Sequence, residues 1–134
     1  MSSFLLDTSA LLALRDDEPG AERVAYLLQS AADSGINCHG CFISLMEVLY
    51  RVWKDEGEEA GRSAYRVCQR LPITWLHESA PLLERAAEIK ARFPLSLADA
   101  WIAAAAFELA ATLVHKDPEY EKVSGLQQEC LLYK

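Results

Sequence analysis

Short apolar runs alternate along the chain with segments in which apolar residues recur at helical spacing. Residues 4–6 form an apolar run that ends at Asp7, which is typical of a short buried strand. Apolar residues three and four positions apart indicate helices with one buried face. The pattern predicts helices near residues 11–14, 24–31, 45–52, 60–71, 82–93 and 98–111. It predicts further strands at residues 36–42, 73–76, 112–115 and 130–133.

This alternation of strand and helix favours the α/β class, in which crossover helices connect parallel strands. We predict a three-layer α/β/α architecture with a mostly parallel central sheet of four to five strands. Gly40 falls inside the second predicted strand and weakens that prediction. The chain has 134 residues and shows no repeat, linker or low-complexity tract, so residues 1–134 are expected to form one domain.

The composition is that of an ordinary globular protein, with 51% apolar residues, 25% charged residues and a net charge of −7. This acidic balance excludes a protein held to nucleic acid by bulk positive charge, so such contact would need a local basic patch and metal ions. The longest apolar stretch, residues 98–114, is interrupted by Asp99 and Glu108, which argues against a transmembrane span. The first residues lack the basic region of a signal peptide, and we expect a cytoplasmic protein without membrane contact.

Four cysteines raise the question of a metal or redox site. Cys38 and Cys41 form a Cys-x-x-Cys pair, which is compatible with zinc or redox chemistry. Cys68 and Cys130 do not supply the second pair that a structural zinc site usually needs. We therefore expect small buried or partly buried thiols in a reducing cytoplasm.

Four acidic residues that are far apart in the sequence fall at one edge of the predicted sheet. Asp7 stands at the carboxyl end of the first strand, and Asp117 follows the fourth strand by two residues. Glu47 and Asp99 lie in the first turns of helices, whose amino ends point to the same edge in a parallel crossover arrangement. Sites in open α/β sheets form at this edge.

Each acid also has a purely structural interpretation. Glu47 and Asp99 each stand three residues after a serine, which fits a capping box. Asp7 can cap the helix after the first strand, and Asp117 can start a turn before a proline. Glu47 can also pair with Arg51, one helical turn later. Separate structural roles do not explain why all four acids share one edge, although 20 acidic residues in the chain leave room for coincidence.

Clustered carboxylates repel one another, and their pKa values rise unless a counter-charge is present. An all-oxygen donor set suits a hard cation, so Mg²⁺ or Mn²⁺ is the expected occupant. Such an ion can activate water and bind charged phosphate oxygens, which indicates metal-assisted hydrolysis of a phosphodiester. No Ser-His or Cys-His arrangement competes strongly, because the three histidines are scattered along the chain.

Four segments resemble, in order, the motifs of the PIN domain family, and within it those of VapC-type toxin ribonucleases. The resemblance covers nearly the whole chain and is carried by FLLDTSALL at residues 4–12, ISLMEVL at 43–49, LADAWIAAA at 97–105 and LVHKDPEY at 113–120. The resemblance implies that the acidic metal site consists of Asp7, Glu47, Asp99 and Asp117. It also implies an assisting hydroxyl beside the first acid, with Ser9 as the first candidate and Thr8 as the second.

The fourth segment departs from the usual family pattern. His115 stands where Thr or Ser is common, and Glu119 stands where a further Asp is common. These departures leave open whether Asp117 binds metal directly and whether Glu119 contributes.

The resemblance implies a Mg²⁺- or Mn²⁺-dependent endoribonuclease that hydrolyses RNA phosphodiester bonds as the toxin of a type II toxin–antitoxin pair. It implies an RNA substrate, a homodimer, and a cognate antitoxin protein that places a basic side chain near the acids. One alternative is a catalytically inactive PIN-like scaffold or RNA-binding module, in which the acids are structural caps. A second alternative is a nuclease that acts on DNA, which we rank last because the chain has no long insertion resembling those that clamp branched DNA.

Two surface features bear on these partners. Met46, Tyr50 and Trp53 form a second apolar face on the third predicted helix, which indicates either packing on the next helix or contact with a partner. A basic stripe on the fourth predicted helix either meets RNA phosphates or faces solvent, and other basic residues lie nearer the acids. The stripe consists of Arg62, Arg66 and Arg70, and the nearer residues are Arg15, Arg51 and Lys116.

Overall fold

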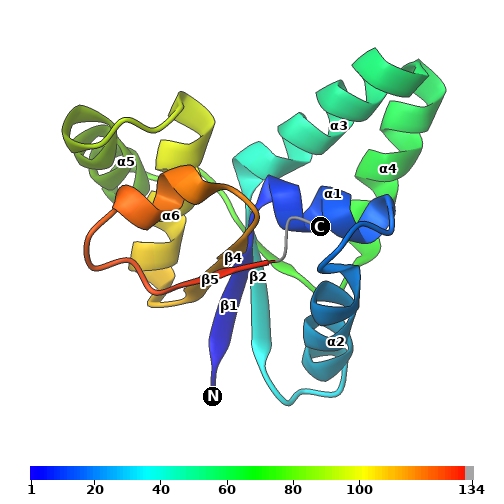
Figure 1. Ribbon diagram of the computed structural model, residues 1–134, viewed down its shortest axis with the longest axis horizontal. Coiled ribbons are helices and arrows are strands. Elements are labelled where there is room, and N and C mark those ends of the chain that lie inside the picture. The colour runs from blue at the N-terminus through cyan, green and yellow to red at the C-terminus, as the bar shows by residue number, and fades with distance from the viewer. Residues whose placement is uncertain (132–134) are drawn as a thin grey trace.

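A five-stranded parallel sheet forms the centre of the protein, and helices cover both of its faces (Figure 1). The computed structural model describes residues 1–131. The strands are β1 (Ser3–Leu6), β2 (Asn37–Cys41), β3 (Thr74–Leu76), β4 (Thr112–His115) and β5 (Gln128–Cys130). The helices are α1 (Thr8–Arg15), α2 (Ala21–Ala32), α3 (Phe42–Glu56), α4 (Glu58–Arg70), α5 (Ala80–Arg92), α6 (Leu97–Leu109) and the short 3-10 helix η1 (Pro118–Lys122).

The order of the strands across the sheet is β3-β2-β1-β4-β5, and every neighbouring pair is parallel. The prediction of an α/β sheet is thus confirmed, and within residues 1–131 the sheet is parallel throughout rather than only for the most part. Because all strands run in the same direction, their carboxyl ends meet at one edge. The central strand β1 ends there, directly before Asp7.

The fifth strand differs from its predicted position. β5 covers Gln128–Cys130, and its residues pair with Leu113, Val114 and His115 of β4. The prediction of a strand at residues 130–133 followed the apolar character of that stretch, whereas this short edge strand carries polar side chains and is defined by its hydrogen bonds with β4. Residues 132 and 133 lie outside the part of the chain that the structure describes.

Neighbouring residues of the central strands point to opposite faces of the sheet and so build two separate cores. Leu5 and Leu113 belong to the core beneath α5 and α6. Leu6 and Val114 belong to the core beneath α1, α2, α3 and α4. All four side chains are completely buried. The two cores confirm the predicted three-layer α/β/α architecture.

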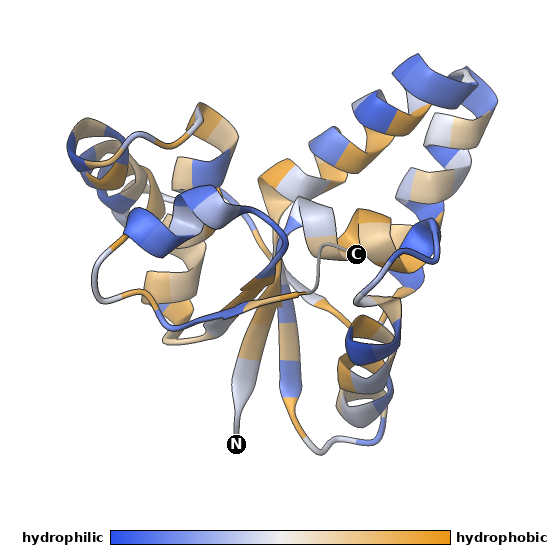
Figure 2. Cartoon of the chain, viewed as in Figure 1, coloured by the Kyte–Doolittle hydropathy of each residue, from blue (hydrophilic) through white to orange (hydrophobic). Residues whose placement is uncertain are grey.

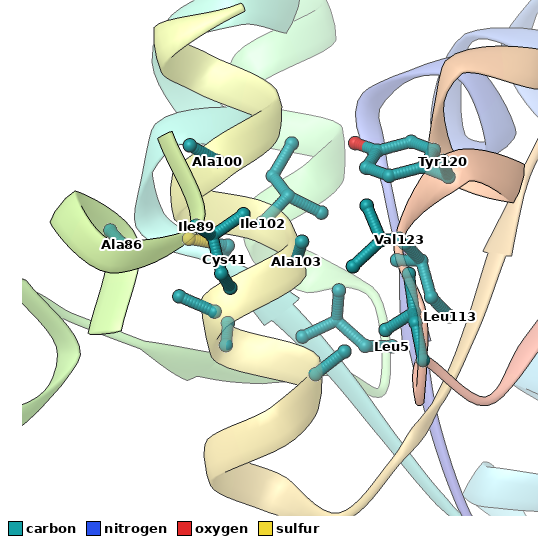
Figure 3. Packing of buried hydrophobic residues seen from close by; sticks show 14 of the residues in the cluster. Leu5, Cys41, Ala86, Ile89, Ala100, Ile102, Ala103, Leu113, Tyr120 and Val123 are labelled. Atoms are coloured by element: carbon teal, nitrogen blue, oxygen red, sulfur yellow. The ribbon is translucent and has the colours of Figure 1, made fainter. Parts of the chain in front are cut away.

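Helix α6 is apolar on almost every side, as Figure 2 shows. Ala103, Ala104 and Ala105 are completely buried, and their small side chains let the helix lie close to β1, β2 and β4. Figure 3 shows Ala103 of this helix on the side of Leu5, while Ile102 points toward Tyr120. This packing fixes the first turn of α6 at the carboxyl edge of the sheet. None of the helices within residues 1–131 combines the length and the apolar character that a bilayer crossing would require.

The two cysteines of the Cys-x-x-Cys pair point to opposite faces of β2. Cys38 belongs to the core beneath α1 to α4, and Cys41 belongs to the core beneath α5 and α6. Both thiols are free, and burial raises the pKa of each to about 11. Thiols on opposite faces of a sheet cannot bridge or share a zinc ion, so the prediction of buried thiols is confirmed for this pair and for Cys68, whereas Cys130 is exposed.

Gly40 lies within β2 because the neighbouring strand leaves no space for a side chain there. Gly40 pairs with Trp75 of β3, and a Cβ atom at position 40 would lie 2.3 Å from the Trp75 ring. The sequence pattern treats glycine as a weak strand former, whereas here its missing side chain allows the β2–β3 pairing.

Helices α3 and α4 form a hairpin that projects beyond the sheet (Figure 1). Gly57 connects them with a positive φ of 105°, which glycine adopts without steric strain. Gly61 of α4 faces the backbone of α3, where an added Cβ would lie 2.7 Å from Leu49 O and 2.8 Å from Trp53 N. The hairpin therefore depends on the absence of a side chain at position 61.

We predict that Gly61→Ala lowers the free energy of unfolding by about 1–3 kcal/mol, because the α3 backbone has to move away from the added methyl group. Urea denaturation measures this change. Gly35→Ala is the matched control, since its Cβ would lie 3.4 Å from Ser30 O, and its effect is expected to stay within about 0.5 kcal/mol. Equal stabilities of the two variants would contradict the close approach of α3 and α4.

Candidate metal centre

The fold brings the four predicted acids to the same edge of the sheet. Asp7 follows β1, Asp117 follows β4, and Asp99 lies in the first turn of α6. The charges of Asp99 and Asp117 help to raise the pKa of Asp7, and the charges of Asp117 and Glu47 help to raise the pKa of Asp99. We call Asp7, Glu47, Asp99 and Asp117 the acidic rim. Its members come from β1, α3, α6 and the segment after β4, so only the tertiary fold assembles it.

Asp7 is buried and is held by two donors of α1. Its Oδ1 atom accepts hydrogen bonds from the backbone N of Ala10 at 2.9 Å and from Ser9 Oγ at 2.6 Å. The first of these bonds confirms Asp7 as the cap of α1. Ser9 Oγ also accepts a hydrogen bond from the backbone N of Lys116 at 2.9 Å. Ser9 therefore orients the Asp7 carboxylate and ties it to the segment that carries Asp117.

Glu47 is buried and is oriented by Thr8, the second hydroxyl candidate. Thr8 Oγ1 lies 2.6 Å from Glu47 Oε1 and 2.9 Å from Ser44 Oγ. Because the carboxylate can only accept, Thr8 donates its single proton to Glu47 and accepts from Ser44. The predicted capping box at Ser44 is wrong, since α3 begins at Phe42 and Ser44 is buried beside Thr8. No sequence pattern predicts the contact between Thr8 and Glu47, because the two residues lie on different helices that are far apart in the chain.

The second oxygen of Glu47 points toward a basic side chain. Arg51 Nη2 lies 3.3 Å from Glu47 Oε2, which confirms the predicted pair on α3. The Arg51 side chain is 45% exposed, so it is accessible to a ligand at the rim while it pairs with Glu47.

Asp99 and Asp117 each hold a structural contact as well. Ser96 Oγ accepts from the backbone N of Asp99 at 3.1 Å and caps α6, while Asp99 Oδ1 accepts from the Tyr120 hydroxyl at 3.0 Å. Asp117 Oδ1 accepts from the backbone N of Glu119 at 2.9 Å and starts η1, as predicted for a turn at this position. The Asp117 carboxyl also lies within hydrogen-bonding reach of Asp99. Sequence reasoning missed Tyr120.

The carboxylate of Glu119 pairs with a lysine and not with a residue of the rim. Its Oε2 atom lies 3.3 Å from Lys122 Nζ, one turn further along η1. The part of Glu119 that supports the rim is its backbone N, which donates to Asp117.

Burial and mutual repulsion make the rim electrostatically unfavourable. Burial raises the pKa of Asp7 from 3.8 to about 7, with further contributions from Asp99 and Asp117, and the hydrogen bonds from Ser9 and Ala10 only partly oppose this rise. Burial and the neighbouring Asp117 carboxyl raise the pKa of Asp99 to about 6. The rim thus favours a bound proton or a bound cation.

Basic residues near the rim are mostly engaged elsewhere. Arg15 forms hydrogen bonds with Glu56 at 2.8 and 3.0 Å, and Lys116 Nζ donates to Pro19 O at 3.0 Å. Within residues 1–131, neither Lys nor Arg forms an ion pair with the three aspartates of the rim. The charge of Asp99 does act on Arg51, whose pKa it helps to raise, so the described part of the protein offsets the negative charge of these aspartates only partly.

The donors of the rim fit a hard divalent cation. All of them are carboxylate oxygens, which Mg²⁺ and Mn²⁺ prefer over nitrogen or sulfur. In residues 1–131, no group of three or more His, Cys, Asp or Glu side chains has the arrangement needed to hold a metal ion together. Mg²⁺ needs only one or two carboxylates, because it retains several of its waters. The rim thus matches the oxygen-rich, sparsely protein-bound coordination that Mg²⁺ adopts.

The family model of the PIN domain matches residues 4–126, and the chain belongs to this family. The matched range contains all four acids of the rim and both hydroxyl residues of α1 that orient them. A comparison with curated proteins gives no match.

Several solved structures share the fold. VapBC2 from Rickettsia felis, bound to a DNA fragment from its promoter, has a TM-score of 0.78 at 18% identity and covers 97% of this chain and 99% of its own. VapBC-1 from nontypeable Haemophilus influenzae has a TM-score of 0.73 at 22% identity, with coverages of 96% and 97%. VapC20 from Mycobacterium tuberculosis, described as a sarcin–ricin loop cleaving toxin, has a TM-score of 0.71 at 19% identity, with coverages of 92% and 95%. At these identities the likeness establishes the fold.

The raised pKa of Asp7 predicts how stability depends on pH. Because the folded protein holds a proton on this carboxyl up to about pH 7 and the unfolded chain releases it near pH 3.8, the contribution of Asp7 to stability is lost as the pH rises between these values. In EDTA, we expect wild-type protein to lose about 2–3 kcal/mol relative to Asp7→Asn between pH 5 and pH 8. Asn retains the Oδ1 acceptor for Ser9 and Ala10.

Urea denaturation of both proteins at the two pH values measures this difference. Asp33→Asn, which changes an exposed acid at the end of α2, is the control and should follow wild type at both pH values. A stability difference between wild type and Asp7→Asn that does not vary with pH would contradict the buried, uncompensated state of Asp7.

Proposed function

We propose that this PIN domain protein, residues 1–134, is a Mg²⁺- or Mn²⁺-dependent endoribonuclease that acts as the toxin of a type II toxin–antitoxin pair. The observation that supports the proposal most is the acidic rim, in which three aspartates at the carboxyl edge of the sheet form no ion pair with Lys or Arg in residues 1–131. One buried and two partly buried like charges are destabilising, so their presence indicates a cation that is part of the working protein. Buried free thiols agree with a reducing cytoplasm.

Asp7, Asp99 and Asp117 would hold the ion. When bound, the ion supplies the Lewis acidity that activates water and offsets phosphate charge. Thr8 holds Glu47 in a fixed orientation, and Glu47 would bind the ion or one of its waters. Arg51 is placed to bind a phosphate oxygen through its exposed guanidinium. Ser9 assists by orienting Asp7, since its own proton is donated to that carboxylate.

The fold comparisons support the choice of substrate and partner. VapC20, which shares the fold, is described as a sarcin–ricin loop cleaving toxin, and the Rickettsia and Haemophilus structures are described as VapBC2 and VapBC-1. We propose RNA as the substrate and an antitoxin protein as the partner of this chain. The basic stripe of α4 is exposed to solvent, with Arg62 paired to Glu58 at 2.8 Å, and lies on the projecting hairpin rather than at the rim.

A groove between α1, α3 and α4 offers a surface for the antitoxin. It has a volume of about 480 Å³ and is lined mainly by apolar side chains, among them Leu11, Leu14, Val48 and Val67. Because α1 also carries Ser9 and Thr8, a chain segment bound in this groove lies on the helix that orients the rim.

We expect Asp99→Asn to reduce the rate of RNA cleavage in Mg²⁺ by about a hundredfold or more, because it removes one charge from the rim. Cleavage of a mixed RNA substrate, followed on gels with Mg²⁺, Mn²⁺ or EDTA, measures this effect. The exposed-acid variant Asp33→Asn should cleave at the wild-type rate. An Asp99→Asn protein as active as wild type would refute the assignment of the rim.

The same experiment separates the nuclease from an inactive scaffold or RNA-binding module. A scaffold would leave RNA intact in either ion and would bind Mn²⁺ without dependence on the rim acids in calorimetry. A preference for DNA over RNA in the cleavage assay would favour the DNA-directed alternative.

We propose a homodimer that uses the exposed apolar face of α3. Met46, Tyr50 and Trp53 are 57%, 43% and 41% exposed, so packing on α4, from which Arg62 lies over the Trp53 ring, leaves much of this face open. Met46→Lys is expected to weaken association at least tenfold, because it places a charge on this apolar face at its most exposed side chain. Light scattering after gel filtration measures the mass, with Leu83→Lys on α5, another exposed apolar side chain, as the control. A wild-type monomer, or a Met46→Lys protein that still dimerises equally well, would contradict this interface.

A further inference from the structure

Tyr120 of η1 reaches the acidic rim from inside the core. Its side chain is completely buried, and its hydroxyl donates to Asp99 Oδ1 at 3.0 Å. Figure 3 shows the ring at the border of the core beneath α5 and α6, with its oxygen directed toward α6. A buried hydroxyl requires a hydrogen-bond partner, and here the partner is a carboxylate on a different element. The bond therefore connects η1 to the first turn of α6.

The backbone of Tyr120 is held on its other side by Gln128 of β5. Gln128 Nε2 donates to Tyr120 O at 3.0 Å, and Gln128 Oε1 lies 2.9 Å from His115 Nε2. His115 Nδ1 accepts from the backbone N of Asp117 at 3.1 Å. Because Nδ1 accepts, the proton of the neutral ring is on Nε2, and His115 donates to Gln128.

These bonds form one continuous path between two acids of the rim. The path starts at the backbone of Asp117, runs through His115 and Gln128, and ends at the carboxylate of Asp99 by way of Tyr120. The rings of His115 and Tyr120 also contact each other, with centroids 4.8 Å apart, and both residues are completely buried. Because these side chains are buried and hydrogen-bonded, the path fixes the position of the Asp99 carboxylate relative to Asp117.

We propose that Tyr120 is a positioning residue that holds the Asp99 carboxylate for a divalent ion, with Gln128 and His115 fixing its place. The proposal rests on the proposed function only in that it assigns an ion to the rim. Because Tyr120 holds Asp99 Oδ1, the Oδ2 atom is kept in a defined orientation and is the oxygen we assign to the ion. Binding through one oxygen suits Mg²⁺ and Mn²⁺, whereas Ca²⁺ often takes both oxygens of a carboxylate.

Tyr120→Phe tests the proposal, because it removes the hydroxyl and keeps the buried ring. We expect the dissociation constant for Mn²⁺, measured by calorimetry with the metal alone, to rise about tenfold. The affinity for Ca²⁺ should fall less, so that the preference for Mn²⁺ over Ca²⁺ becomes smaller. Tyr65→Phe is the matched control, since the Tyr65 hydroxyl accepts a hydrogen bond from Gln69 on α4, away from the rim. Its Mn²⁺ affinity should equal that of wild type.

A purely structural role for the hydroxyl would lower the melting temperature in EDTA and leave the Mn²⁺ affinity unchanged, and this result would overturn the proposal. If Tyr120→Phe fails to fold, Gln128→Met tests the same path. This variant keeps the Tyr120 hydroxyl and removes the hydrogen bond from Gln128 to the Tyr120 backbone O. Weaker Mn²⁺ binding of this variant supports the proposal, and wild-type binding overturns it.

The outcome is distinguishable from a failure of the proposed function. RNA cleavage by wild-type protein tests the function, whereas the difference in Mn²⁺ affinity between wild type and Tyr120→Phe tests the positioning role. A wild-type protein that cleaves RNA and a Tyr120→Phe protein that binds Mn²⁺ equally well would overturn only the positioning role. A wild-type protein that leaves RNA intact, combined with weaker Mn²⁺ binding by the variant, would overturn only the function.

Discussion

The cost of placing four carboxylates at the carboxyl edge of the sheet, with Asp7 and Glu47 buried and Asp99 and Asp117 partly buried, determines how the rest of the site is built. Parallel strands bring Asp7 and the segment with Asp117 to one edge, and the alanine-rich face of α6 brings Asp99 to the same place. Burial then raises the pKa of Asp7 to about 7, because the low-polarity surroundings disfavour its charge. A protein that only needed stability would carry neutral side chains here. We interpret the charged carboxylates of the rim as residues that are present because they bind a cation.

Structural and chemical roles of the rim acids do not compete. Asp7 uses Oδ1 to cap α1, and Asp117 uses Oδ1 to start η1. Each of these bonds engages one oxygen and holds the carboxylate in a defined orientation, which is what preorganises a ligand for a cation. The helix caps that explain each acid singly are therefore also the contacts that prepare the rim as a group.

The strong patterns of the sequence were sufficient to predict most of the fold. Periodicity located the six α-helices of residues 1–131 but not the short 3-10 helix η1, and alternation of strand and helix predicted a mostly parallel sheet with the four acids at one edge. The pattern failed where hydrogen bonds rather than burial define an element, as in β5, whose Gln128 and Glu129 are polar. It also missed the contacts from Thr8 to Glu47 and from Tyr120 to Asp99, because a side-chain hydrogen bond between distant segments leaves no periodic signal.

Anomalous diffraction from a crystal soaked in Mn²⁺ shows whether the acidic rim binds a divalent cation. We expect one or more anomalous peaks within coordination distance of Asp7, Asp99 and Asp117. A crystal saturated with Mn²⁺ that shows no peak at the rim, or in which an arginine or lysine occupies the space between the three carboxylates, would rule out a cation site there.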